Sequence, residues 1–185
     1  YAASIGVHAG ALALAVAVPA LWPWSVAAFV ANHALVAGLS FVPRNQALGP
    51  ALTRLPPVFE LQGAVALTFD DGPDPDVTPR VLDELDRRGA RATFFCVGER
   101  VRRHPALAAE IVRRGHAVEN HSYSHATTSG FWTPARWRAD LLAAQQAIAD
   151  ATGRAPRFFR PPFGVRAPLL EPALATLGLH NVTWS

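Results

Sequence analysis

Lysine is absent from this 185-residue chain, and all 17 of its cationic side chains are arginine. Against 14 carboxylates they give a formal net charge of +3, which is too small and too evenly spread to indicate a nucleic-acid-binding protein. Cys96 is the only cysteine, so a disulfide scaffold is excluded. The absence of low-complexity tracts and of blocks of like charge argues against a disordered interaction tail.

Charge is also missing from the first 43 residues, which contain no Asp, Glu, Lys or Arg. Two apolar runs, 2–20 and 25–42, lie on either side of Trp22-Pro23-Trp24. A bilayer is crossed by about 20 apolar residues, and tryptophan favours its interface. We therefore predict a transmembrane helical hairpin at residues 1–43. The alternatives are a buried core hairpin and a removed signal peptide, although a signal peptide needs no second run.

Residues 44–62 contain Gly49 and three prolines and show no helical or strand periodicity, which is typical of a linker. A soluble domain is predicted at 63–185. In it, short apolar strands alternate with helices, and this pattern favours a parallel sheet, open or closed into a barrel. Strands are expected at 65–69, 92–97, 117–119, 158–159 and 181–184. Helices are expected after N-caps at Thr78 and Thr133, around 107–112, and at 168–177.

Right-handed crossovers place the carboxyl ends of all parallel strands at one edge of the sheet, where ligands bind. Asp70 and Asp71 follow the first strand, His121 and His125 follow the third, and Arg160 follows the fourth. We expect these side chains to converge. Taken singly, each cluster has a simpler interpretation: a tight turn for the aspartates, surface positions for the histidines and a structural ion pair for the arginine.

Two imidazoles four residues apart face the same way on one helical turn, and with one carboxylate they form an open metal site. One aspartate could hold the cation while the other takes protons. Arg160 would orient an aspartate through its rigid guanidinium. Because Pro161 and Pro162 lack an N–H, the first backbone donor after Arg160 is that of Phe163, and a lone donor in a metal cleft suits an oxyanion.

Three segments together resemble the first three motifs of the polysaccharide deacetylase family, which is the NodB homology domain of carbohydrate esterase family 4. They are Thr68-Phe69-Asp70-Asp71-Gly72-Pro73, His121-Ser122-Tyr123-Ser124-His125 and Arg160-Pro161-Pro162-Phe163-Gly164. The resemblance covers residues 63–185. It implies an α/β fold, a distorted (β/α) barrel of parallel strands, and a divalent metal, usually zinc, used to remove N- or O-acetyl groups from glycans.

The resemblance also assigns roles by position within the motifs. Asp70 would be the catalytic base and Arg160 would orient it, both counted as catalytic residues. Phe163 would offer its N–H to the substrate oxyanion. The remaining residues would be the metal ligands: Asp71, His121 and His125.

The later motifs of the family, including a Leu-x-His segment that supplies the catalytic acid, are not in this sequence. His180 and His116 precede their strands, so we expect them at the opposite end of the sheet from the site. His104 precedes a helix. We interpret the chain, which starts at Tyr1, as a fragment that is incomplete at its C-terminus, and a degenerate homologue is the alternative.

The leading functional hypothesis is a membrane-bound, metal-dependent hydrolase that removes acetyl groups from an N-acetylated polysaccharide such as peptidoglycan, a chitin-like oligomer or an exopolysaccharide. The alternatives are a deacylase of a lipid-linked sugar and a non-catalytic glycan-binding homologue. Arg44 and Arg54 after the hairpin favour a cytoplasmic domain. Because the glycan polymers of the family are outside the cell, we expect an extracytoplasmic domain instead. The sequence does not indicate an oligomeric state.

Overall fold

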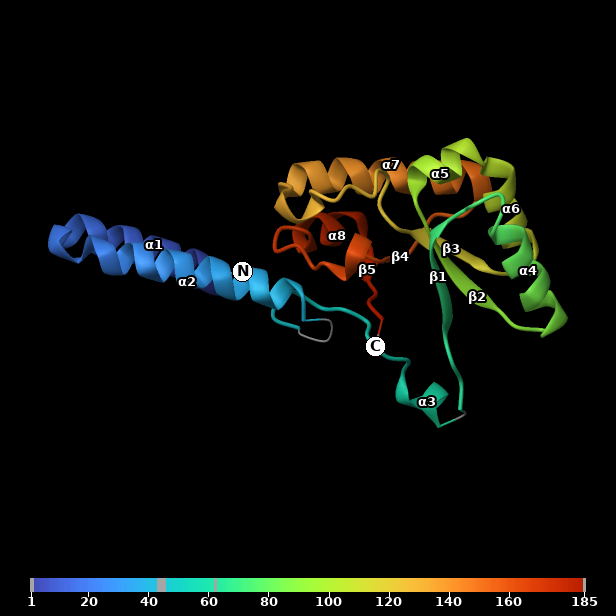
Figure 1. Ribbon diagram of the computed structural model, residues 1–185, viewed down its shortest axis with the longest axis horizontal. Helices are drawn as coiled ribbons and strands as arrows, with labels where there is room; N and C mark the ends of the chain where they lie inside the picture. The colour runs from blue at the N-terminus through green and yellow to red at the C-terminus, as the bar shows by residue number, and fades with distance from the viewer. Residues whose placement is uncertain (1, 43–45, 62, 185) are drawn as a thin grey trace.

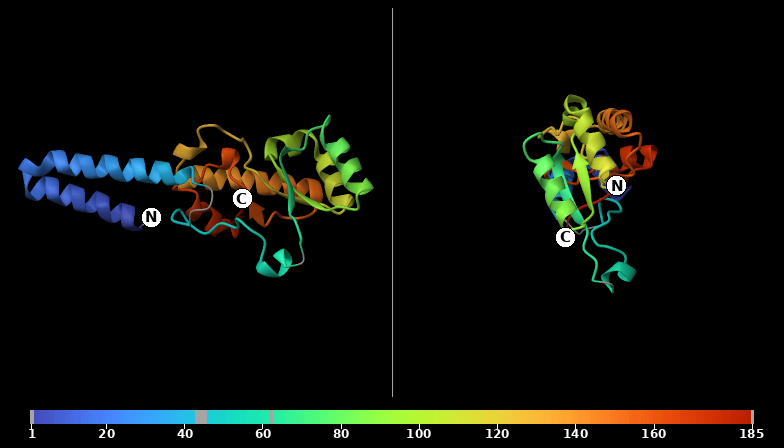
Figure 2. Two further views of the ribbon diagram at one scale, coloured as in Figure 1. Left: turned by 60° about the horizontal axis from the view of Figure 1, so that its bottom comes forward. Right: turned by 90° about the vertical axis from the view of Figure 1, so that its right-hand side faces the viewer.

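The computed structural model describes residues 2–42, 46–61 and 63–184, and it places a pair of N-terminal helices beside an α/β domain (Figure 1). Helices α1 and α2 lie side by side and extend away from the domain, as Figure 1 and the left view of Figure 2 show. The N-terminal elements are α1 (Ala2–Ala17), η1 (Pro19–Leu21), α2 (Trp22–Ser40) and α3 (Pro57–Glu60). The domain contains β1 (Leu67–Gly72), α4 (Thr78–Arg87), β2 (Ala92–Cys96), α5 (Gly98–Arg103), α6 (Pro105–Arg113), β3 (Ala117–Asn120), η2 (Ser129–Phe131), α7 (Pro134–Thr152), β4 (Phe158–Phe159), η3 (Pro162–Gly164), α8 (Glu171–Leu177) and β5 (His180–Asn181).

The five strands form one parallel sheet in the order β1-β2-β3-β4-β5. Because this order follows the chain without reversal, right-handed crossovers place the connecting helices on one face, which is the winding of a (β/α) barrel. The predicted parallel α/β architecture is confirmed. Within the described residues the sheet is open, and Leu52 extends its β5 side through a parallel bridge to Val182.

The domain is held together by two clusters of buried apolar side chains. In the first, helices α4 and α6 pack on the sheet around Leu82, Phe94 and Ile111. In the second, α7 and α8 pack on β4 around Trp137 and Phe159. This burial fixes the strand ends, and therefore the loops that follow them, relative to one another.

Five local predictions differ from the structure. The first strand is Leu67–Gly72 instead of 65–69, so Asp70 and Asp71 lie within it and do not follow it, and the last helix is Glu171–Leu177 instead of 168–177. Thr78 is not an N-cap, because α4 already begins there and its hydroxyl accepts a hydrogen bond from the Asp74 amide at 2.9 Å. Helix α5, which begins at Gly98, was not expected, because its six residues lie directly after a strand and lack an apolar repeat. The last strand is His180–Asn181 instead of 181–184. The N-cap at Thr133 is confirmed, since its hydroxyl accepts from the Arg136 amide at 3.3 Å.

Helices α1 and α2 contact each other through a few polar and aromatic groups. The Asn32 side-chain amide donates to the Ser4 hydroxyl at 2.8 Å, and the rings of His8 and Phe29 lie 4.9 Å apart. Among the described residues, one helix, Pro19–Ser40, is long and apolar enough to cross a membrane. The first helix is shorter, so a transmembrane hairpin stays a prediction, as does the side of the membrane on which the domain lies.

The base of the hairpin is fastened to the domain through Arg166. The backbone N–H of this buried residue donates to the Ser40 carbonyl at 3.1 Å, and its guanidinium donates to the Gly49 carbonyl at 2.6 Å. The segment predicted as a linker thus follows the domain surface at Gly49 and again at Leu52. The boundaries at residues 43 and 63 stay predictions.

Candidate metal centre

One carboxylate and two imidazoles meet at the carboxyl ends of β1 and β3. The nearer carboxylate oxygen of Asp71 lies 3.0 Å from Nε2 of His125 and 3.4 Å from Nε2 of His121. The three ligand atoms all lie within 4.8 Å of one another, and no other group of three such side chains occurs among the residues that the structure describes. The convergence that the strand pattern predicted is therefore present.

A β-bulge directs the two adjacent aspartates to different partners. Asp70 pairs with Phe95 and Gly72 with Cys96, so Asp71 is an extra residue in β1, and its φ of 65° lies in the left-handed region. Adjacent residues of a regular strand point to opposite faces, and a bulge reorients a side chain. As a result, the Asp71 carboxylate faces the histidines while that of Asp70 faces Arg160.

The segment between the two histidines is a loop and not the helical turn suggested by their spacing. Ser122 and His125 have φ values of 66° and 48°. The Asn120 side-chain oxygen accepts from the Ser122 amide, and the Ser122 hydroxyl accepts from the His125 amide, each at 2.8 Å. These local hydrogen bonds fold the loop so that both rings turn toward Asp71.

Asp140 on α7 anchors the same loop and was missed by the sequence analysis. Its carboxylate accepts from the Tyr123 amide at 2.8 Å, from the Ser124 amide at 3.2 Å and from the Ser124 hydroxyl at 2.7 Å. In the sequence, the residue is marked only as an acidic group beside the apolar stripe of a helix. Because that helix is distant in the chain, no local pattern connects it to the histidines.

Strained backbone is concentrated at this site. Among the described residues, four that are not glycine have a positive φ, namely Asp71, Ser122, His125 and Phe163. Such conformations cost about 1–3 kcal/mol each, and they persist where the surrounding contacts impose them. Strain at this one edge of the sheet is an independent indication of function.

The environment of His121 suits metal binding. Its Nδ1 contacts the Arg160 carbonyl at 2.7 Å, so this nitrogen carries the proton and Nε2 is left as the ligand atom facing Asp71. Burial lowers the pKa of His121, which favours the neutral imidazole that binds metals. Two imidazole nitrogens and one carboxylate oxygen fit a divalent metal of the zinc or cobalt type.

Asp70 is oriented by a buried arginine. Nη1 of Arg160 lies 2.8 Å from Asp70 Oδ1 and 2.8 Å from the Thr68 hydroxyl. The guanidinium, in a side chain that is only 5% exposed, stacks over the ring of Phe95 at 4.1 Å and lies 5.6 Å from that of Trp184. Held from two sides, it fixes the Asp70 carboxylate beside the metal ligands. Thr68, Phe95 and Trp184 were not anticipated in this role.

Phe163 borders the site on its open side. Its ring lies 4.7 Å from that of His125 and is 55% exposed, and its backbone is left-handed. The role of its N–H toward an oxyanion stays a prediction.

The other candidate groups lie apart from the metal centre. His116 is buried, with Nδ1 3.3 Å from the Ala92 amide at the start of β2, and His180 begins β5, so both occupy the opposite end of the strands. Burial strongly raises the pKa of the Cys96 thiol, which makes it an unreactive core residue. Among the described residues we find no proton donor for a leaving group beside Asp70.

Residues 60–182 match the family model described as polysaccharide deacetylase. The chain belongs to the polysaccharide deacetylase family.

Two curated relatives of this polysaccharide deacetylase chain differ in their named substrates. The present chain is 39% identical over 100 residues to a peptidoglycan-N-acetylglucosamine deacetylase of Bacillus cereus, and the match covers 54% of this chain and 36% of the relative. It is 41% identical over 123 residues to a chitooligosaccharide deacetylase of a Bradyrhizobium species, covering 66% and 56%. The chain thus spans about a third to a half of these relatives.

Solved structures of polysaccharide deacetylase relatives share the fold. A family 4 carbohydrate esterase from Streptomyces lividans in complex with acetate superposes with a TM-score of 0.62 at 39% identity, covering 65% of this chain and 62% of that one. A family 4 acetyl xylan esterase from Clostridium thermocellum with a cobalt ion gives 0.54 at 40% identity, covering 57% and 51%. A family 4 pseudoenzyme from Bacillus anthracis gives 0.59 at 28% identity, covering 64% and 42%.

Proposed function

We propose that this chain is a metal-dependent hydrolase that removes acetyl groups from an N-acetylated polysaccharide of the peptidoglycan or chitin type. The observation that carries the proposal is the convergence of Asp71, His121 and His125 within 4.8 Å, beside a carboxylate that an arginine orients. The named activities of the relatives support the reaction class.

Asp71, His121 and His125 would hold the metal, which we expect to be zinc. When bound, such a metal lowers the pKa of a water molecule to about 7 and polarises a carbonyl oxygen. The neutral state of His121 and its hydrogen bond to the Arg160 carbonyl support this assignment. The cobalt ion of the acetyl xylan esterase is consistent with the same type of donor set.

Asp70 is the proposed general base. Arg160 holds its carboxylate in one orientation, from which it takes a proton as water attacks the acetyl carbon. The N–H of Phe163 donates to the oxygen on which negative charge then develops. The carbon–nitrogen bond breaks, acetate leaves, and the sugar amine takes up a proton.

The test is metal content and acetate release, measured on the same samples of the purified chain with a soluble N-acetylglucosamine oligomer as substrate. We expect one equivalent of metal and acetate release from the wild type. His125→Ala should lose the metal and all activity. Asp70→Asn should keep the metal and lose activity by about 100-fold or more, as expected for a general base. His180→Ala, an exposed histidine outside the site, is the matched control for both readouts.

Two results would contradict the proposal. Equal metal content in the wild type and His125→Ala would remove the assignment of the ligands. Unchanged acetate release in Asp70→Asn would remove the assignment of the base while leaving the metal site in place.

A non-catalytic glycan-binding protein is the second candidate. It is supported by a specific observation, the pseudoenzyme in the same family at 28% identity. In that case the oligomer binds to the wild type without acetate release, and Asp70→Asn changes neither binding nor turnover.

We also infer that α2 anchors the domain to a membrane. The length of Pro19–Ser40 and its largely unburied apolar surface support this inference. Flotation of the chain with lipid vesicles tests it, since a domain without an anchor stays in the aqueous fraction.

A further inference from the structure

A large cavity separates the helical hairpin from the domain. Its volume is about 1190 Å³, which exceeds the range of about 300–1000 Å³ that is usual for small-molecule sites. Apolar side chains from both sides line it, including Val36, Ala37, Phe41, Val165, Leu169 and Ala175. It lies where the end of α2 approaches α8 (Figure 1).

One end of the cavity borders the metal centre. Phe163 lines the cavity, and the same ring lies 4.7 Å from that of His125. The cavity and the candidate metal centre therefore share the Phe163 side chain, although Asp71, His121 and His125 do not themselves line the cavity.

The other end of the cavity lies along the helix that can cross a membrane. Helix α2 contains 19 residues, which span about 28 Å at 1.5 Å per residue, close to the hydrocarbon thickness of a bilayer. Exposed Trp22 and Trp24 mark the far end of this helix. The α2 residues that line the cavity lie between Asn32 and Ser40, in the half of the helix away from these tryptophans.

The lining is mostly apolar, and its polar side chains are Ser4, His8, Asn32, His33, Ser40, Gln46, Thr127, Ser129 and Glu171. The five of these that belong to the hairpin already have hydrogen-bond partners within it. Phe131, also in the lining, is 93% exposed. Burying hydrocarbon against such walls is favourable, whereas burying hydroxyl groups without partners is costly.

We propose that this cavity holds the hydrocarbon chain of a lipid-linked glycan, whose sugar lies at the metal centre. This assignment rests on the proposed function, and it specifies the substrate class as a membrane-anchored acetylated saccharide. The position of the cavity selects this occupant: one wall belongs to the helix of membrane length, and another includes Phe163, whose ring lies 4.7 Å from that of the candidate ligand His125. A soluble polymer would leave the apolar walls uncovered.

The test compares two substrates on the full chain reconstituted in lipid nanodiscs. They are a trimer of N-acetylglucosamine and the same trimer carrying an octyl chain. We expect the octyl trimer to bind at least about tenfold more tightly, because withdrawing two or three methylene groups from water supplies a gain of that size. Binding is measured against empty nanodiscs, which correct for partition of the octyl chain into lipid.

Two variants fill the cavity from opposite walls, Ala37→Trp on α2 and Ala175→Trp on α8. Each should abolish the preference for the octyl trimer while leaving affinity for the plain trimer, metal content and thermal unfolding unchanged. Leu35→Trp is the matched control, because Leu35 is exposed, does not line the cavity, and lies about 200° around α2 from Ala37. It should keep the full preference.

Three results would overturn the assignment: equal binding of the two trimers by the wild type, a preference that persists in both cavity variants, or octyl glucoside binding as tightly as the octyl trimer. The last would mean that the cavity holds bilayer lipid. Acetate release is followed in parallel. Preference for the octyl trimer without acetate release would contradict the proposed activity alone, and acetate release at equal efficiency from both trimers would contradict the cavity assignment alone.

Discussion

Helices α2 and α7 both contain 19 residues, yet they bury opposite kinds of side chain. The buried residues of α2 are Ser25 and Ser40, whereas α7 buries only apolar residues, Trp137 and Leu141 among them. A helix that is apolar on all sides is typical of a membrane span or of the interior of a large protein. A helix with a single apolar stripe is typical of the surface of a soluble domain, where the stripe packs on the core and the opposite face contacts water. The two helices therefore differ in composition: α7 has the single apolar stripe of a core helix, whereas α2 is long and apolar enough to cross a membrane.

The same contrast extends to the polar groups. In the hairpin, Asn32 and Ser4 bind each other across the two helices. In the domain, Asp140 on the polar face of α7 holds the loop that carries the two histidines of the candidate metal centre. The hairpin uses polar groups to join its own helices, and the domain uses them to shape a site.

The largest effect is expected from placing the same charge in each helix. Leu141→Asp puts a carboxylate in a fully buried position of α7 and should cost more than about 4 kcal/mol, enough to unfold most domains. Leu35→Asp in α2, where the leucine is 62% exposed, should leave domain unfolding unchanged and weaken membrane insertion by up to about 3 kcal/mol. Circular dichroism melting and vesicle flotation measure the two effects. If Leu35→Asp melts the domain as Leu141→Asp does, α2 is a core helix.

A second comparison uses one residue type in both regions. Asn120 is fully buried; its amide donates to the Leu141 carbonyl at 3.1 Å and its oxygen accepts from the Ser122 amide. Asn120→Ala should lower the free energy of unfolding by about 2–3 kcal/mol, because buried partners lose their hydrogen bonds. Asn32→Ala removes a single bond between helices and should cost about 0.6 kcal/mol. The two costs are compared by thermal unfolding, measured for the domain in Asn120→Ala and for the helical hairpin in Asn32→Ala. Equal costs would show that the two asparagines lie in equivalent environments.

The anchoring carboxylate of α7 should affect metal affinity. Asp140→Ala frees the loop between the histidines, and loss of such a supporting contact raises the metal dissociation constant about 10- to 100-fold. Asp150→Ala, on the same helix but bound only to Gln146 among the described contacts, should leave affinity unchanged. Titration with zinc against a competing chelator provides the measurement. Unchanged affinity in Asp140→Ala would show that the loop holds its shape without α7.

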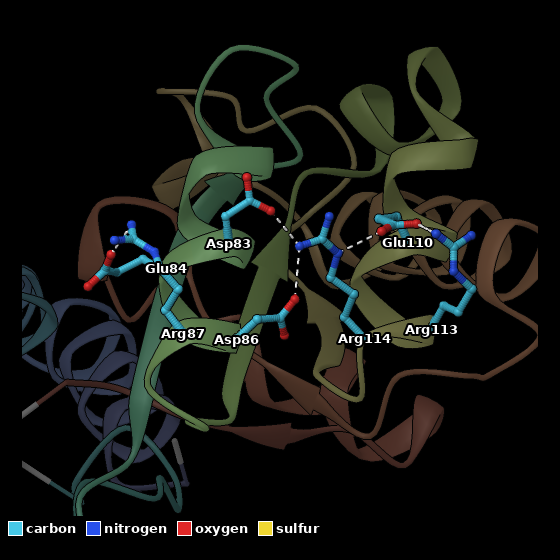
Figure 3. A network of polar contacts seen from close by, with 7 residues as sticks. All are labelled: Asp83, Glu84, Asp86, Arg87, Glu110, Arg113 and Arg114. Carbon is cyan, nitrogen blue, oxygen red and sulfur yellow. Dashed lines mark hydrogen bonds and ion pairs between the residues drawn. The ribbon is translucent and has the colours of Figure 1, made fainter.

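The smallest effect is expected from the ion pairs between α4 and α6 (Figure 3). Arg114 lies 2.7 Å from Asp83, 3.0 Å from Asp86 and 2.6 Å from Glu110. Arg114→Met should cost about 1 kcal/mol or less and should reduce the dependence of domain stability on salt. Unfolding measured at low and high salt checks this. The hairpin, which contains no Asp, Glu, Lys or Arg, should show no salt dependence of its own.

Much of the site was predictable from residue type and chain order. The strand pattern predicted that the two aspartates and the two histidines converge, because parallel strands end at one edge, and Asp71, His121 and His125 do meet there. The choice of Asp71 over Asp70 as the metal ligand came from the resemblance to the deacetylase motifs. The predicted conformation of the segment between the histidines was wrong, because their four-residue spacing suggested a helical turn and the segment is a loop. The actual shape depends on Asp140, which is distant in the sequence, and no periodicity encodes such a contact.

The bulge at Asp71 could not be predicted for a similar reason. It exists only in the pairing of β1 with β2, in which Asp70 and Gly72 have partners and the residue between them has none. The environment of Arg160, between Phe95 and Trp184, likewise brings together residues from three parts of the chain.

The sequence by itself determined which region is apolar and uncharged, the order of strands and helices, and the chemical types at the candidate metal centre. Charge, hydropathy and turn residues act over a few positions, so their patterns can be recognised in the sequence alone. Tertiary structure alone decided which aspartate faces the histidines, which nitrogen of His121 is left to bind, and where an apolar cavity opens beside Phe163. These features depend on packing and hydrogen bonds between distant segments, which form only when the sheet and helices assemble.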